Sequence, residues 1–177
     1  MKQEQLSLYT VSMKLIRNMH NQGDDRVFSV SPQVGKDNRP FVGLVVVLDK
    51  RQYCIPLSSP KPKHKTMKNG LDFHRVLDSN GKLIAVLDFN NMIPVRPDVI
   101  QKIEAKIRKN DSPPTKHYKE LLSDQLTFCR QNHDVIVKKA NKLYRMVHQK
   151  STSSQLKRRC LNWGKLEKVL DRFSSDS

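Results

Sequence analysis

The sequence predicts an α+β fold in which a compact, twisted antiparallel sheet is followed by several helices. Short apolar runs separated by turn residues fill residues 1–95, whereas helical spacing of apolar residues prevails in residues 96–173. An Asn-Gly pair between two of the runs marks a tight hairpin. Strands that come first, with helices after them, favour an α+β arrangement over alternating α/β units. We expect one domain over residues 1–177, because this length suits a single core.

The N-terminal segment predicts a strand and then a short helix. Residues 6–11 alternate as in a half-buried strand, and Ser12 is suited to cap a helix whose apolar residues share one face. Residues 21–39 are polar and contain Gly and Pro, so we expect a long connection there.

The next segments predict the centre of the sheet. Residues 41–48 form a continuous, valine-rich apolar run, which is typical of a strand covered on both faces. A second strand follows over residues 52–57. Residues 71–77 and 83–89 flank Asn80-Gly81 and predict a hairpin.

The second half of the chain predicts helices. Val99, Ile103 and Ile107 recur four apart after Pro97, a residue type suited to a helix start. Three residues, Ser112-Pro113-Pro114, are expected to end this helix.

A longer helical stretch is expected over residues 118–147, with a bend near Asn132. Residues 151–154 then form a polar spacer, and Asn162 can cap a last helix.

The charge of the chain indicates a polyanionic partner. There are 33 Lys and Arg residues against 17 Asp and Glu, a formal net charge of +16. Phosphates neutralised by Lys and Arg release condensed counterions, so nucleic acid is the leading partner. No run approaches the ~20 apolar residues of a membrane-spanning helix, and no signal peptide is evident, so we predict a cytoplasmic protein.

The cysteines and carboxylates do not predict a metal site or another cofactor. Cys54, Cys129 and Cys160 lie far apart and are expected to be reduced thiols in the core. Asp72-x-His74 is the closest pair of possible ligand types in the strand region, and a pair alone is a weak metal signal.

The segment Pro56-Leu57-Ser58-Ser59-Pro60-Lys61 is the most informative in the chain. Two hydroxyls and a lysine follow a core strand, and the prolines restrict the backbone around them. Small donors beside a fixed cation suit a phosphodiester. The same composition is also typical of an ordinary solvated turn, so the residues alone leave both readings open.

Several motifs occur in the order and spacing of one known family. They are Phe41-Val42-Gly43-Leu44-Val45, the segment from Pro56 to Lys61, Met92-Ile93-Pro94, Tyr118-Lys119 and Arg130-Gln131-Asn132. Together they resemble the ToxN/AbiQ family, the endoribonuclease toxins of type III toxin–antitoxin systems. The resemblance runs from Leu8 to about Val147, and it implies a Kid/MazF-like barrel core elaborated by helices.

The resemblance also implies a reaction and its residues. An RNA's own 2′-hydroxyl can attack the adjacent phosphate without metal, which leaves a 2′,3′-cyclic phosphate and a 5′-hydroxyl. Ser59 and Lys61 match the positions that matter most for cleavage in the family, and Ser58 stands where a threonine is common. Lysine is charged near neutrality, so Lys61 is better suited to stabilise charge or act as an acid than to act as a base.

The family supplies a partner as well. A small structured RNA, usually a pseudoknot that the toxin cuts from tandem repeats, occupies the toxin's basic groove and blocks it. We therefore expect an RNA antitoxin rather than a protein one, repeated contacts that close into a heteromeric assembly, and cellular mRNA as the substrate. The implied role is growth inhibition in defence against phage.

The general base and the residues that stack on RNA bases are less determined. His64, three residues after Lys61, is the best placed of the four candidate histidines; the others are His74, His117 and His133. The mechanism could also proceed without a histidine. Tyr9, Phe28 and Tyr53 are candidates for stacking on bases, whereas the remaining aromatics considered are expected in the core: Phe41, Phe89, Tyr118 and Phe128.

Three basic clusters are the predicted RNA-binding surface. They comprise Lys63, His64, Lys65 and Lys68; Lys138, Lys139, Lys142 and Arg145; and Lys157, Arg158 and Arg159. Basic residues would equally suit an RNA-binding protein without catalysis, such as a regulatory or ribosome-associated module. Charge does not separate this alternative from an endoribonuclease, whereas Ser58, Ser59 and Lys61 favour the enzyme.

Overall fold

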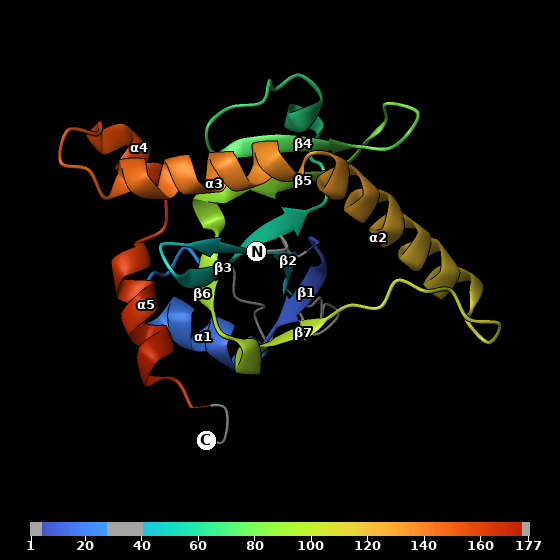
Figure 1. Cartoon of the computed structure of the whole chain (residues 1–177), viewed down its shortest axis with the longest axis horizontal. Helices are drawn as coiled ribbons and strands as arrows, with labels where there is room; N and C mark the ends of the chain where they lie inside the picture. The colour runs from blue at the N-terminus through green and yellow to red at the C-terminus, as the bar shows by residue number, and fades with distance from the viewer. Residues whose placement is uncertain (1–4, 28–40, 175–177) are drawn as a thin grey trace.

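The chain forms a seven-stranded antiparallel sheet with helices around it (Figure 1). The computed structural model describes residues 5–27 and 41–174. The strands are β1 (Leu8–Val11), β2 (Phe41–Leu48), β3 (Arg51–Ser58), β4 (Phe73–Leu77), β5 (Leu83–Asp88), β6 (Ile93–Val95) and β7 (Ile100–Lys102). The helices are α1 (Met13–Gln22), α2 (Pro113–Gln131), α3 (His133–Val147), α4 (Ser154–Arg159) and α5 (Trp163–Arg172). Short 3₁₀ turns are η2 (Pro62–Lys65), η3 (Phe89–Asn91) and η4 (Pro97–Val99).

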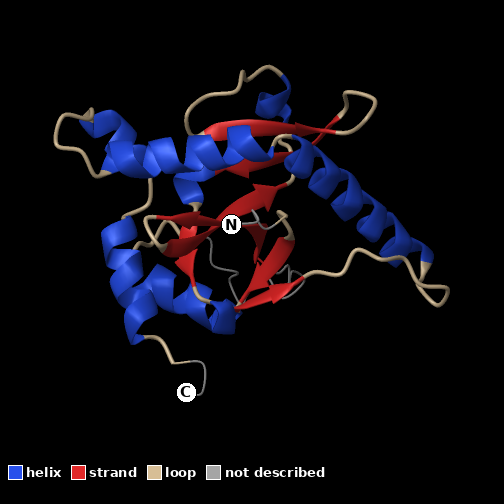
Figure 2. Cartoon of the chain, viewed as in Figure 1, coloured by secondary structure: helices blue, strands red, loops and turns tan. Residues whose placement is uncertain are grey.

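The sheet is open, with the strand order β4-β5-β3-β2-β1-β7. Strand β6 lies off this path and pairs with β3. The predicted α+β class is confirmed, but the barrel that the family resemblance implies is not closed, because β4 and β7 are edge strands that do not pair with each other. Figure 2 shows the strands in the middle of the molecule and the helices at its periphery.

The β2–β3 hairpin forms the centre of the sheet. Asp49 and Lys50 both take positive φ, 48° and 67°, as a two-residue turn of this twist requires. Gly43 pairs with Pro56, and a Cβ at Gly43 would lie 2.3 Å from the Ile55 carbonyl oxygen. The close approach of the two backbones therefore requires glycine here.

Strand β3 has partners along both edges. It pairs with β2 on one side, while on the other its first half pairs with β6 and its last two residues, Leu57 and Ser58, pair with β5. The predicted β4–β5 hairpin is confirmed, with Gly81 at φ 77° in its turn. The end of β3 is thus held in a paired sheet.

The helices cover different parts of the sheet. Helix α5 packs on α1 and β6, α3 contacts β2 and η3, and α2 contacts β4 and β5 (Figure 1). The N-terminal half of α2 projects beyond the sheet. Tyr118, predicted to be a core residue, lies in this half and is 47% exposed, so that prediction is wrong.

Helix ends follow the sequence signals in most places. Ser12 and Asn162 cap α1 and α5 as predicted, each accepting a backbone N–H with its side-chain oxygen. The predicted bend near Asn132 is the boundary between α2 and α3. Helix α4, capped by Ser153, was not predicted.

The helix predicted after Pro97 is wrong. Val99 ends the short turn η4, and Ile100 begins β7, which pairs with β1. Ile107, placed on the same predicted helical face, is 43% exposed. In β7, the backbone N–H and C=O groups of these residues form hydrogen bonds with β1, a strand far away in the sequence. This tertiary pairing outweighs the local helical spacing of the apolar residues. Residues 113 and 114, expected to stop this helix, instead begin α2 after the Ser112 cap.

The core is apolar and includes the three cysteines, which are buried free thiols as predicted. Trp163 is 1% exposed, and its Nε1 donates to the Met92 carbonyl at 2.8 Å. Residues 28–39 of the predicted long connection lie outside the described residues. Over the ranges described, the structure has no helix long and apolar enough to cross a bilayer.

Replacing Gly43 with Ala tests the contact between the two central strands. The added methyl group would meet the Ile55 backbone, so we expect Gly43→Ala to lower the free energy of unfolding by about 3 kcal/mol. Chemical denaturation followed by circular dichroism measures the change. Gly70→Ala is the matched control, because the nearest atom to its Cβ would be 3.8 Å away. Equal stability of the two variants would contradict the contact.

Candidate functional site

A cavity of about 520 Å³ lies at the C-terminal end of β3. Ser58, Ser59 and Lys61 all line it, together with Asp88 at the end of β5. Its apolar wall comes from Val27, Phe41, Val42, Leu57 and Leu161. The structure thus brings the three predicted catalytic residues together around one cavity, which we call the β3-end pocket.

The turn after β3 holds the backbone of Lys61 in place. The Lys61 N–H donates to His64 Nδ1 at 2.8 Å, and the His64 N–H donates back to the Lys61 carbonyl at 2.9 Å. The His64 ring stacks on Phe73 with centroids 5.1 Å apart. These contacts fix the backbone of η2 while the Lys61 side chain stays exposed.

His64 itself does not have the predicted role. It is 6% exposed, and its Nδ1 accepts a backbone N–H, so the proton of the neutral ring lies on Nε2. This burial contradicts the prediction that His64 contacts RNA, and a neutral ring with its acceptor nitrogen engaged does not suit the predicted role of general base. Its position three residues after Lys61 reflects a local turn contact.

Asp88 is a pocket residue that the sequence analysis missed. Ser58 Oγ donates to Asp88 Oδ2 at 2.8 Å. Burial raises the pKa of Asp88 above the usual value, although the Ser58 hydrogen bond and the nearby charges of Lys61 and Lys63 oppose the shift. A carboxylate at a strand end carries no distinct sequence signal, because pairing of β3 with β5 creates the contact.

Arg26 is a second missed residue of the β3-end pocket. Its guanidinium pairs with Asp24 at 2.7 Å and donates to the carbonyl oxygens of Arg158 and Cys160. Burial raises the pKa of Asp24, but hydrogen bonds from Arg26 and Asn162 outweigh burial and lower it to about 2. Arg26 therefore joins the C-terminal end of α4 to the pocket. Lys61 is the pocket cation without an ion pair among the described residues.

A second polar contact joins β4 to α3. Lys139 Nζ lies 2.7 Å from His74 Nδ1, so the lysine donates to an unprotonated ring nitrogen. Burial, with the Lys139 charge, lowers the pKa of His74 to about 4, and burial lowers that of Lys139. Lys139, predicted to bind RNA, is half-buried and engaged in this contact.

The residues predicted to stack on RNA bases differ in how far they are buried. Tyr53 is 0% exposed, and its hydroxyl donates to Glu167 Oε1 at 2.5 Å, so the prediction that it stacks on RNA is wrong. Tyr9 is half-buried in β1. Phe28 lies outside the described residues. Core packing explains Tyr53, whose ring makes edge contacts with Tyr144 and Trp163.

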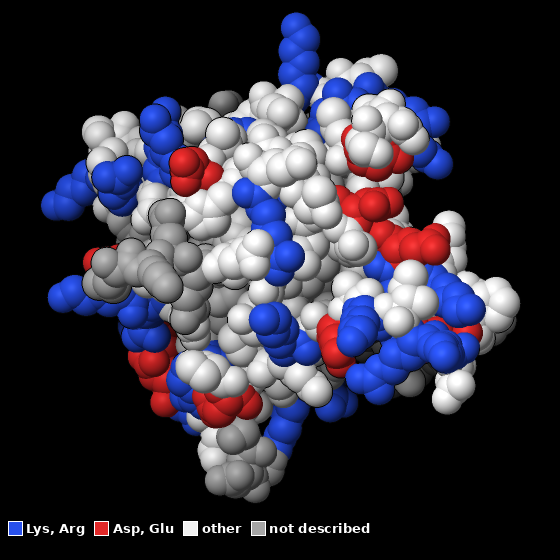
Figure 3. Space-filling model, turned by 45° about the vertical axis from the view of Figure 1, so that its right-hand side comes forward, with Lys and Arg blue, Asp and Glu red and all other residues white. Residues whose placement is uncertain are grey.

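The basic residues of the η2 loop and of α3 are mostly exposed. They are Lys63, Lys65 and Lys68 in the loop, and Lys138, Lys142 and Arg145 on α3. Figure 3 shows Lys and Arg side chains spread over the displayed face, with fewer acidic ones among them. The structure therefore presents a broad cationic surface rather than one compact patch.

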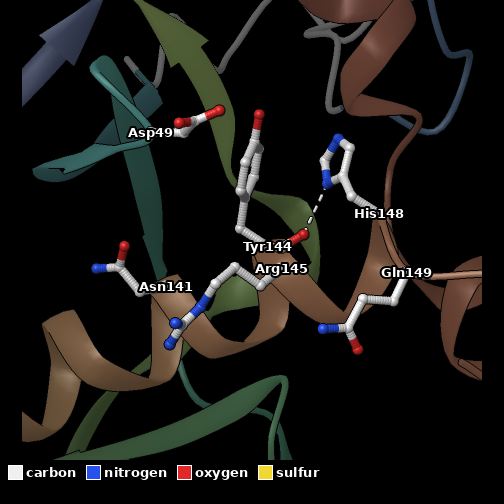
Figure 4. Close-up of a pocket in the computed structure, with 6 residues that line it drawn as sticks. All are labelled: Asp49, Asn141, Tyr144, Arg145, His148 and Gln149. Atoms are coloured by element: carbon white, nitrogen blue, oxygen red, sulfur yellow. Dashed lines mark hydrogen bonds between the residues drawn. The ribbon is translucent and has the colours of Figure 1, made fainter.

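Arg145 lines a separate cavity of about 600 Å³ (Figure 4). The other lining residues are Asp49 from the β2–β3 turn and Asn141, Tyr144, His148 and Gln149. His148 Nδ1 donates to the Tyr144 carbonyl at 2.7 Å, and the two rings lie 4.3 Å apart. None of the predicted catalytic residues lines this cavity.

The third basic cluster forms the end of α4. Lys157 is half-buried, whereas Arg158 and Arg159 are exposed. Arg159 Nε lies 3.4 Å from Asp72, just before β4. Since Arg26 holds the Arg158 carbonyl, this cluster lies next to the β3-end pocket.

The pair Asp72-x-His74 does not form a common site. Asp72 contacts Arg159, and His74 contacts Lys139. Within residues 5–27 and 41–174, no three His, Cys, Asp or Glu side chains are placed to hold a metal ion.

The fold and pocket define a class of protein: a basic α+β domain with hydroxyls, a cation and a carboxylate around one cavity at a sheet end. A family model described as "Toxin ToxN, type III toxin-antitoxin system" matches residues 7–171. The chain is also similar to the endoribonuclease ToxN of Pectobacterium atrosepticum, with 30% identity over 149 residues, 81% of this chain and 82% of that one. The chain belongs to the ToxN family of type III toxin–antitoxin systems.

Solved structures share the fold of this chain. One is a bacterial type III toxin selectively inhibited by a non-coding RNA pseudoknot; it has 25% identity and a TM-score of 0.76, over 95% of this chain and 97% of that one. Another is AbiQ, a lactococcal anti-phage endoribonuclease of a type III system, which has the same fold with a TM-score of 0.76 at 22% identity, over 95% and 97% of the two chains.

The His74–Lys139 contact predicts a pH dependence of stability. The His74 pKa is about 4 in the folded protein and 6.5 for an unperturbed histidine, so the unfolded chain binds more protons between these limits. The free energy of unfolding therefore rises with pH across this window and falls on acidification. We expect His74→Gln to lose less stability than the wild type between pH 6.5 and pH 5, measured by urea denaturation.

His117→Gln is the control for this experiment, because His117 is exposed on α2. It should keep the wild-type pH dependence. If His74→Gln and the wild type respond identically to pH, His74 is not the group responsible.

Proposed function

We propose that this protein is an endoribonuclease toxin that cuts cellular mRNA and its own repeat antitoxin RNA. The observation that carries the proposal is the convergence of Ser58, Ser59 and Lys61 on one open cavity. These residues come from the most specific part of the family resemblance, and relatives that share the fold are endoribonucleases. A protein that only bound RNA would gain little from two hydroxyls and a lysine at a rigid strand end.

The reaction we propose is a metal-independent transesterification. The 2′-oxygen attacks the adjacent phosphorus, and the products are a 2′,3′-cyclic phosphate and a 5′-hydroxyl. Lys61 stabilises the negative charge that builds on the phosphate oxygens and can protonate the leaving oxygen, while Ser59 donates a hydrogen bond to the phosphate. The hydrogen bonds of the η2 turn hold the Lys61 backbone, which reduces the entropy lost when the substrate is positioned.

The broad cationic surface supports RNA as both substrate and inhibitor. A relative with this fold is inhibited by a non-coding RNA pseudoknot. We infer that a similar small structured RNA restrains this toxin by occupying the β3-end pocket, in a closed protein–RNA assembly and without a protein antitoxin. Release of the toxin in the cytoplasm would inhibit growth as a defence against phage.

The second candidate remains a non-catalytic RNA-binding module. The net charge of +16 favours RNA binding in either case. Cleavage of RNA, and its dependence on Lys61, separates the two.

Replacing Lys61 with Ala tests the catalytic proposal. We expect Lys61→Ala to reduce cleavage of purified cellular RNA in excess EDTA by about 10²- to 10³-fold, because the developing phosphate charge loses its cation. RNA binding and the thermal midpoint should change little, since Lys61 is exposed. Sequencing and end-group analysis of the wild-type products should give cyclic-phosphate ends at a recurrent motif.

Lys65→Ala is the matched control, because this exposed lysine shares the η2 turn but does not line the pocket. It should keep most cleavage activity. Intact RNA bound tightly by both the wild type and Lys61→Ala would support the binding module instead.

Lys138 and Lys142 test the contribution of α3 to RNA binding. Both are exposed and lie four residues apart, so they present charge on one helical face. The logarithm of the RNA-binding constant falls linearly with the logarithm of the salt concentration. If each lysine contacts a phosphate, replacing both with Ala should make this slope less steep by about 1.4 for single-stranded RNA. Fluorescence anisotropy over a salt series measures the slope, and an unchanged slope would place RNA elsewhere.

A further inference from the structure

The carboxylate of Asp88 lines the β3-end pocket together with Ser58, Ser59 and Lys61, the residues proposed to act on the scissile phosphate. Register pairs Ser58 with Val86 and Leu57 with Leu87, so Asp88 is the diagonal neighbour of Ser58 on the same face of the sheet. The Ser58 hydroxyl donates to Asp88 Oδ2 at 2.8 Å. Asp88 Oδ1 has no hydrogen-bond partner in the described part of the chain, and the residue lines the pocket.

Asp88 is also the one carboxylate among the described residues that line the β3-end pocket. The pocket cations are Lys61 and Arg26, and Arg26 is paired with Asp24. Lysine and arginine are protonated near neutrality, and a serine hydroxyl is a weak base. Asp88 is therefore the pocket side chain best suited to accept a proton.

The four candidate histidines are less well placed than Asp88 to accept a proton in the pocket. His64 Nδ1 accepts the Lys61 N–H, and His74 Nδ1 accepts from Lys139, so each ring uses its unprotonated nitrogen in a structural contact. His117 and His133 lie on α2 and α3 and do not line the pocket. No histidine is among the described residues that line the β3-end pocket, so none of these four is placed to accept the proton of the 2′-hydroxyl.

We propose that Asp88 accepts the proton of the attacking 2′-hydroxyl, with Ser58 orienting its carboxylate. This inference rests on the proposed ribonuclease function. As the bond between the 2′-oxygen and phosphorus forms, the proton moves to Asp88 Oδ1, and the bond between phosphorus and the 5′-oxygen breaks. Lys61 gives a proton to the departing 5′-oxygen, and exchange with water restores Asp88 and Lys61 afterwards.

The surroundings of Asp88 suit a base. Burial raises its pKa, which makes the carboxylate a stronger acceptor than an exposed one. The charged or titratable groups that face it are Lys61, Lys63 and His64 of the η2 turn, and the two lysines, with the Ser58 hydroxyl of β3, favour its ionised form and oppose the effect of burial on its pKa. On β4 the residue paired with Asp88 is the apolar Phe73.

The decisive variant is Asp88→Asn, which keeps the shape of the side chain and an oxygen that accepts from Ser58. We expect cleavage to fall by about 10²- to 10⁴-fold, the usual contribution of a general base. Binding of a non-cleavable 2′-deoxy oligonucleotide should be unchanged or tighter, because a negative charge is removed. In the wild type the cleavage rate should fall as pH drops through the Asp88 pKa, and this acid limb should be absent from the residual activity of Asp88→Asn.

Ser58→Ala gives a second, independent readout. Loss of its hydrogen bond to the charged carboxylate should move the acid limb to higher pH. Asp78→Asn is the control, because Asp78 accepts backbone N–H groups in the β4–β5 turn, which an Asn side chain can also do. It should cleave at the wild-type rate.

The outcomes distinguish this inference from the proposed function. If the wild type does not cleave RNA, the proposed function fails. If the wild type cleaves, Lys61→Ala does not, and Asp88→Asn is within threefold of the wild type, Asp88 is not the proton acceptor. An acid limb that persists in a slow Asp88→Asn variant would likewise overturn the assignment, since Asp88 would then only position other groups.

Discussion

Pairing along both edges of β3 is the constraint on which the pocket depends. The strand contacts β2 closely enough to require glycine at position 43, and its other edge is divided between β6 and β5. Because the last two residues of β3 pair with β5, the chain leaves the sheet at Ser59 with its direction set. The hydrogen bonds between Lys61 and His64 then fix the backbone of the turn that follows the strand.

The same pairing joins chemically different groups. Ser58 and Asp88 are thirty residues apart in sequence, yet they form a hydrogen bond because β3 and β5 are neighbours. Arg26 connects Asp24 to carbonyl oxygens at the end of α4 and just after it, about 130 residues further along the chain. Hydroxyl, cation and carboxylate therefore come from segments that are themselves held by backbone contacts, an arrangement that suits electrostatic stabilisation of a reacting phosphate.

Several carboxylates, some buried and some exposed, are engaged by other side chains of the protein, which affects the charge that it presents. Asp24 pairs with Arg26, Glu167 accepts from Tyr53 and Tyr144, and Asp171 pairs with Arg51. Most lysines of η2 and α3 remain exposed instead. This distribution leaves positive charge available to RNA at some distance from the pocket, consistent with a partner larger than the cleavage site.

Local features of the sequence determined the hairpin at Asn80-Gly81, the caps at Ser12 and Asn162, and the placement of Ser58, Ser59 and Lys61 after a core strand, because each depends on neighbouring residues. The motif order further indicated the family. Tertiary structure alone decided that residues 100–102 form β7, that Tyr53 and His64 are buried, and that Asp88 and Arg26 join the pocket. These outcomes depend on pairing and burial between distant segments, whose energies no local pattern contains.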